Sequence, residues 1–199
     1  MAKQMKKLNT KSLTLLALMT ALVVLVQIIS ANVKFGPFSI TLAHIPIVIG
    51  AALLGPIAGA WLGMTMGITV LLSGDAAAFL TVNFAATGFV VLLKGLLAGL
   101  AAGLIYKLLS KKNDTVAIFS AAFTCPIVNT AVFFIGSLLF FLPTIATWAG
   151  EGTSAISFII VGLIGWNFVV EMATALVLTP VIKKIITVGK KMRHNKNYI

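Results

Sequence analysis

The sequence predicts an all-α membrane protein, a compact bundle of six transmembrane helices with both termini in the cytoplasm. Of its 199 residues, 60% are hydrophobic and only 10% are charged, which is not the composition of a soluble fold. Several apolar runs exceed the roughly 18 residues that indicate a spanning helix. We expect one integral membrane domain over residues 1–199, with short basic tails at 1–12 and 188–199.

Six apolar segments are the predicted spans. They cover residues 13–30, 40–54, 56–72, 84–108, 115–141 and 156–187. The first follows a basic start and is longer than the core of a usual secretory signal, so it is retained as a helix. The second is short and meets the third at Gly55-Pro56, which indicates a tight helical hairpin or a broken, partly re-entrant pair. External loops are expected at 31–41, 73–83 and 142–154, either as lids or as ordinary connectors.

The basic residues indicate the orientation of the bundle. An even number of spans places thirteen of the fifteen Lys and Arg residues on one side, which the positive-inside rule assigns to the cytoplasm. These thirteen are Lys3, Lys6, Lys7, Lys11, Lys107, Lys111, Lys112, Lys183, Lys184, Lys190, Lys191, Arg193 and Lys196. The net charge of +11 is therefore explained by membrane topology rather than by nucleic-acid binding. Contact with anionic membrane lipid is a secondary possibility.

Small residues predict where helices approach closely. Glycines recur every four residues in the third and fourth spans, which favours packing inside the bundle. They are Gly55, Gly59, Gly63 and Gly67, then Gly95, Gly99 and Gly103. Ala17 and Ala21 form a comparable face on the first span, although alanine is so common here that this pair alone is weak evidence for a partner helix.

Ionised residues within two of the spans mark the candidate site. Lys94 lies in the fourth span and Glu171 in the sixth, and an ionised group at that depth costs roughly 2.5 to 3.5 kcal/mol. Two interpretations stay open. The two residues neutralise each other, or Lys94 anchors an anionic ligand while Glu171 holds Lys94 or accepts hydrogen bonds from ligand hydroxyls.

Other polar residues belong to the same candidate site. Asn167 shares a helix face with Glu171 and Thr87 shares one with Lys94, so these groups are expected to converge with Asn129 in the outer half of the bundle. Each Asn either contacts ligand or joins two helices. Further candidates are His44, Asn83 and Trp61. The competing interpretation is helix-end bonding for His44 and core packing for Trp61.

Motifs for catalysis are not found in the sequence. It contains no Walker A sequence, HExxH, GxSxG or CxxC, and two histidines with few acidic residues give little support for a metal site. No cofactor is expected. The chain is predicted not to be an enzyme, so any active uptake draws its energy from partner proteins or from an ion gradient.

Four segments together resemble the substrate-binding S components of energy-coupling factor (ECF) transporters. They are LALMTALVVL, HIPIVIGAALLGPIAGAWLG, LLKGLLAGLAAGLIYKLL and GWNFVVEMATALVLTPVI. The resemblance spans nearly the whole chain, and LLGPIAG and NFVVE are its more specific parts. It implies a six-helix vitamin-binding subunit in a prokaryotic plasma membrane, working with a transmembrane coupling subunit and two cytoplasmic ATPases.

The same resemblance implies roles for particular regions. Ala17 and Ala21 match the family's docking face for the coupling subunit, and the ligand pocket is expected beneath the first and third external loops. The HIPIVIGAALLGPIAG stretch looks most like pantothenate-type members. Riboflavin, folate, thiamine and hydroxymethylpyrimidine remain alternatives, as do a stand-alone carrier coupled to protons or sodium and a lipid-metabolising membrane enzyme.

Overall fold

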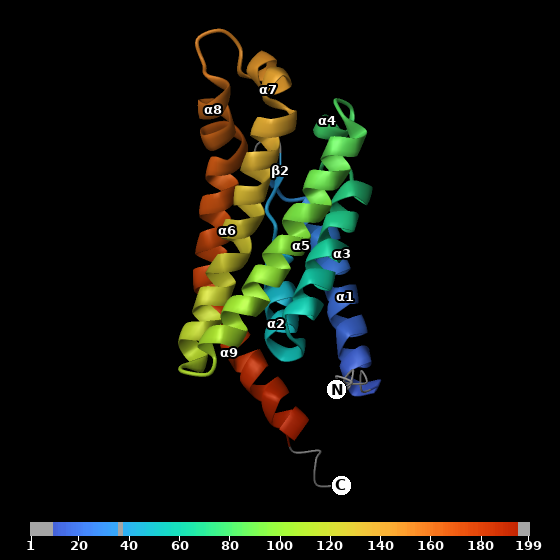
Figure 1. Cartoon of the computed structure of the whole chain (residues 1–199), viewed down its shortest axis with the longest axis vertical. Helices are drawn as coiled ribbons and strands as arrows, with labels where there is room; N and C mark the ends of the chain where they lie inside the picture. The colour runs from blue at the N-terminus through green and yellow to red at the C-terminus, as the bar shows by residue number, and fades with distance from the viewer. Residues whose placement is uncertain (1–9, 36–37, 195–199) are drawn as a thin grey trace, which may run out of the picture.

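The structure is a computed structural model that describes residues 10–35 and 38–194. Its long helices run side by side along one axis, and α1 begins at the same end of the molecule at which α9 ends (Figure 1). In chain order the elements are α1 (Thr10–Ala31), β1 (Lys34–Phe35), β2 (Phe38–Ser39), α2 (His44–Leu54), α3 (Pro56–Leu72), α4 (Ala77–Leu80), α5 (Phe84–Leu109), α6 (Asp114–Phe140), α7 (Leu142–Ala149), α8 (Ala155–Ser157), the π-helix η1 (Phe158–Gly165) and α9 (Trp166–His194).

The described residues form the all-α membrane bundle that the sequence predicts. Helices α1, α5 and α6 and the continuous stretch Ala155–Lys190 are long and apolar enough to cross a membrane. Helices α2 and α3 have 11 and 17 residues and complete the six predicted segments. Gly55 alone connects these two, and its φ of 103° is a backbone conformation that favours glycine. The Gly55-Pro56 junction is therefore a tight hairpin.

The second predicted span starts too early. Helix α2 begins at His44 rather than at residue 40, because the preceding residues form a short antiparallel hairpin in which Lys34 pairs with Ser39. At the other end of the chain, α9 continues through most of the predicted basic tail to His194. The external segment 142–154 is also more structured than a plain connector, since it contains the eight-residue helix α7.

Glycines bring the backbones of α3 and α5 into direct contact. A Cβ atom built on Gly63 would overlap the carbonyl oxygen of Gly95, and one built on Gly95 would overlap that of Gly63. Gly59 and Gly99 form a second pair of the same kind. Close backbone approach allows van der Waals contact to hold helices together where lipid supplies no hydrophobic drive. The prediction that glycines pack inside the bundle is confirmed for these four, whereas a Cβ on Gly55 would meet no atom within 4 Å.

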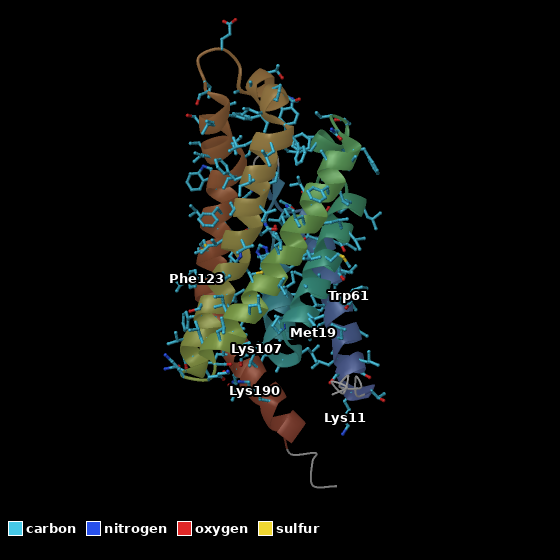
Figure 2. The ribbon with its side chains drawn as sticks, in the orientation of Figure 1. Lys11, Met19, Trp61, Lys107, Phe123 and Lys190 are labelled. Atoms are coloured by element: carbon cyan, nitrogen blue, oxygen red, sulfur yellow. The ribbon has the colours of Figure 1, made fainter. Side chains whose placement is uncertain are left out.

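A polar cluster joins three elements at the end where α1 begins. The Tyr106 hydroxyl donates to Asp114 Oδ1 at 2.8 Å, and the Lys190 ammonium donates to the same oxygen at 2.7 Å. The Lys190 ammonium also lies 5.2 Å from the centroid of the Tyr106 ring. Figure 2 shows Lys11, Lys107 and Lys190 near this end. It is the end that the distribution of basic residues assigns to the cytoplasm.

Candidate functional site

A cavity lies in the half of the bundle away from the Tyr106–Asp114–Lys190 cluster. Its empty volume, including the space at its open mouth, is about 800 Å³. Ligand sites typically combine apolar walls with a few polar groups. The walls come from α3, α4, α5, α6, η1 and α9, together with the segments around Ser39 and Asp75.

Five of the predicted site residues line this cavity: Thr87, Lys94, Asn129, Asn167 and Glu171. Residues four or seven apart lie on one face of an α-helix, so α5 presents Thr87 with Lys94 and α9 presents Asn167 with Glu171. Asn129 comes from α6 between them. The structure therefore brings together the groups that the sequence analysis expected to converge.

Two amide groups at the cavity make no use of their oxygens within the described part of the chain. The Oδ1 atoms of Asn129 and Asn167 are buried and accept no hydrogen bond there. Buried polar atoms in folded proteins are nearly always hydrogen-bonded, and leaving one unpaired costs roughly 1 to 3 kcal/mol. These oxygens are therefore suited to accept hydrogen bonds from a bound molecule.

The Lys94 ammonium reaches the aromatic wall of the cavity. It lies 5.3 Å from the centroid of the Phe133 ring, a cation–π distance. Among the described residues the ion pairs join His44 to Glu171 and Lys190 to Asp114, so Lys94 has no carboxylate at ion-pair distance. The direct Lys94–Glu171 pair that the sequence left open is not formed.

Glu171 contacts the chain segment before α2 instead. Its Oε1 accepts a hydrogen bond from the backbone N–H of Thr41 at 3.0 Å, and its Oε2 lies 3.7 Å from His44 Nδ1. His44 is buried but lies beyond the main cavity. It lines a second, smaller one of about 310 Å³, mouth included, which shares Thr41 and Glu171 with the first.

Two predicted site residues do not line either cavity. Asn83 caps the start of α5, where its Oδ1 accepts a hydrogen bond from the N–H of Ala86 at 3.0 Å. Trp61 is 47% exposed on α3, and its Nε1 donates to the Thr20 hydroxyl at 3.2 Å. Figure 2 shows it on the outer side of the bundle. Helix capping and helix-to-helix bonding account for these two residues.

Sequence reasoning missed a carboxylate at the cavity. Asp75 lies in the loop between α3 and α4, where its Oδ2 accepts from the Ser39 hydroxyl at 2.6 Å and its Oδ1 from the Ser39 N–H at 3.3 Å. The sequence feature that could have indicated Asp75 is the rarity of acidic residues, because the whole chain has only four.

The cavity wall is also more aromatic than the sequence analysis assigned. Four phenylalanines line it: Phe79, Phe133, Phe141 and Phe168. The Phe79 ring lies edge-on to those of Phe141 and Phe133, with centroids 4.8 and 5.8 Å away. Aromatic rings therefore form a large part of the apolar wall of the cavity.

The residues in contact with the cavity do not resemble a metal site. Within residues 10–35 and 38–194, no three His, Cys, Asp or Glu side chains gather as metal binding requires. The donors at the cavity are one ammonium, several hydroxyls and amides, which suit an organic molecule that carries negative charge and hydrogen-bonding groups.

Comparison with known proteins identifies the family. The family described as "ECF transporter, substrate-specific component" matches residues 11–183. The chain belongs to this family. It is therefore a multi-pass membrane protein and a transporter subunit without a catalytic domain, which removes the alternative of a membrane enzyme. As an S component it acts with a substrate and with partners of the ECF module.

One relative is similar over its whole length. The pantothenic acid transporter PanT of Lactococcus lactis subsp. cremoris (strain MG1363) is 27% identical over 208 aligned positions. The alignment covers 96% of this S component and all of PanT.

Proposed function

We propose that this S component captures pantothenate from outside the cell in the main cavity. Pantothenate is an aliphatic molecule with one carboxylate, two hydroxyls and an amide. The observation that carries the proposal is the Lys94 ammonium, which faces the cavity without a carboxylate at ion-pair distance among the described residues. Lys94 binds the carboxylate by a charge-assisted hydrogen bond.

The remaining polar groups suit the rest of the vitamin. The unpaired oxygens of Asn129 and Asn167 accept hydrogen bonds from its hydroxyls or its amide N–H. Thr87 and Thr130 line the same space. The full-length similarity to PanT, whose name states its substrate, supports the same assignment.

A vitamin with a flat ring is the second candidate. The four phenylalanines of the cavity favour it, because aromatic side chains stack on planar ligands. Riboflavin, folate, thiamine and hydroxymethylpyrimidine are the members of this class to compare.

Binding to the purified chain separates the candidates. We expect radiolabelled pantothenate to bind the detergent-purified protein without partner subunits, and unlabelled riboflavin, folate, thiamine or hydroxymethylpyrimidine not to displace it. Mass spectrometry of small molecules extracted from the protein is an independent check. Displacement by a ring vitamin, or its recovery in place of pantothenate, would contradict the assignment.

We further propose that the partners are a transmembrane coupling subunit and two cytoplasmic ATPases, with the first docking on α1. Ala17 and Ala21 are both exposed, one helical turn apart, on the side of α1 away from buried Met19 and Val23. Small residues at this spacing let a second helix approach closely.

Bulky substitutions test the docking face. We expect Ala17→Trp and Ala21→Trp to leave vitamin binding by the isolated subunit unchanged but to reduce vitamin uptake by cells at least about tenfold, since a large side chain prevents close helix contact. Uptake and co-purification with the partner subunits are the measurements. Leu22→Trp is the control, because Leu22 is exposed on α1 and lies about 100° around the helix from Ala21.

Two results would contradict this arrangement. Normal co-purification of both alanine variants would exclude docking through this face. Uptake driven by an ion gradient in vesicles that contain this chain alone would instead identify a stand-alone carrier, because no partner would then be required.

A further inference from the structure

The segment Ser39–Thr41 lies along the wall of the ligand cavity and is held by two carboxylates from distant parts of the chain. Asp75 accepts hydrogen bonds from both the N–H and the hydroxyl of Ser39. Glu171 accepts one from the N–H of Thr41. Ile40, between these anchors, is only 6% exposed. Ser39 and Thr41 both line the cavity, and in the view of Figure 1 β2 is seen through the gap between the ribbons of α5 and α6.

The groups that hold this segment are carboxylates, which are rare in this chain. It has only four acidic residues, and two of them bind the same three-residue segment. Hydrogen bonds to a carboxylate are about twice as strong as those between neutral groups. Three such bonds on a segment this short fix its position far more firmly than ordinary loop contacts would.

The same bonds occupy the carboxylates. Asp75 and Glu171 both line the cavity, yet the described hydrogen bonds of these two carboxylates go to Ser39 and Thr41, and their ion pairing is limited to the contact of Glu171 with His44. An anionic ligand held by Lys94 would be repelled by a carboxylate in direct contact. Both observations favour a structural role for these acids over direct contact with the ligand.

We propose that Asp75 and Glu171 are positioning residues that hold the Ser39–Thr41 segment against the cavity and thereby slow dissociation of the bound vitamin. The vitamin leaves when the segment is released from either anchor. Glu171 acts through Thr41, and Asp75 acts through Ser39. This inference rests on the proposed ligand-binding role of the cavity, but its first test does not require the ligand to be known.

The first test measures whether the segment is released. In a Cys125→Ala background, the Ile40→Cys variant is expected to react slowly with a membrane-impermeant maleimide. Adding Asp75→Ala or Glu171→Ala is expected to raise the reaction rate at least about tenfold, since charge-assisted bonds of this strength correspond to that factor or more. Asp75→Asn and Glu171→Gln retain an acceptor oxygen and are expected to keep most of the protection.

A control separates release of the segment from unfolding. Native Cys125 is fully buried in α6, so it should stay unreactive when Asp75→Ala or Glu171→Ala is made in the otherwise native chain. Unchanged reactivity at position 40 in both alanine variants would overturn the proposal. So would equal labelling of Cys125 and of the cysteine at position 40, because general loosening would then explain the result.

The second test measures dissociation of radiolabelled pantothenate after dilution into excess unlabelled vitamin. We expect release from Asp75→Ala at least about tenfold faster than from the native protein, with the amide variants within about threefold of native. Weaker binding with unchanged labelling at position 40 would show direct ligand contact and overturn the positioning role. If the native protein binds no pantothenate, the proposed vitamin fails while the labelling result still decides the role of both acids.

Discussion

Replacing Lys94 with alanine is expected to weaken pantothenate binding at least about tenfold while the bundle stays folded. Hydrogen bonds to charged groups contribute about 1.5 to 3 kcal/mol, and each 1.4 kcal/mol is a factor of ten in affinity. Among the side chains that the structure describes, no other Lys or Arg lines the main cavity, so none of these replaces the lost charge. Equilibrium binding to the purified variant measures the effect.

The alcohol analogue of pantothenate makes this test specific. It lacks the carboxylate, so the native protein should bind it much more weakly than pantothenate, and Lys94→Ala should bind both with similar affinity. Lys107→Ala is the matched control, because Lys107 lies in the last turn of the same helix and is exposed. Native affinity in a folded Lys94→Ala variant, judged by its elution and thermal transition, would remove Lys94 from the site.

The fold was predictable because the bilayer itself sets the length of a spanning helix and the side on which basic loops lie. A helix needs about 20 apolar residues to cross it, and Lys and Arg stay on the cytoplasmic side, whatever the packing inside. The start of α2 was not predictable in this way. Residues 40–43 are apolar enough to be predicted as helix, but pairing of Ser39 with Lys34 and hydrogen bonds of Ser39 and Thr41 to distant carboxylates keep this segment outside it.

The candidate site was predictable only within single helices. Spacings of four and seven residues place Asn167 with Glu171 and Thr87 with Lys94, since these intervals follow from helix geometry. The partner of Glu171 is 130 residues away in the chain and the partner of Asp75 is 36 away. Such pairings depend on tertiary packing, so the sequence offered Lys94 as the obvious partner of Glu171.

Trp61 shows the same limit for an aromatic residue. A tryptophan within an apolar span suits a substrate ring, a packed core or a lipid-facing surface equally well. The helix face decides among them, and on α3 that face is fixed by the glycine contact with α5 on the opposite side. With the glycines directed to α5, Trp61 faces outward and bonds to Thr20.

Adding one methyl group at Gly63 is expected to destabilise the protein more than almost any other single-atom change. The new Cβ would overlap the carbonyl oxygen of Gly95 and lie 2.7 Å from its carbonyl carbon. Both are backbone atoms, so no side chain can rotate to relieve the clash, and α3 must separate from α5. We expect Gly63→Ala to lose about 1 to 3 kcal/mol or more, measured as a lower thermal transition in detergent.

Gly88→Ala provides the matched control on α5. A Cβ at Gly88 meets no atom within 4 Å, and replacing a helical glycine with alanine where the backbone permits it stabilises by about 0.4 to 1 kcal/mol. Because the two variants are expected to change stability in opposite directions, the comparison distinguishes the steric clash from an effect of helix propensity. Gly63→Ala should also weaken vitamin binding, because Lys94 is adjacent to Gly95 and moves with the same stretch of α5. Equal transitions for the two variants would mean that α3 and α5 are not in backbone contact, and the position of Lys94 in the cavity would then lose its structural basis.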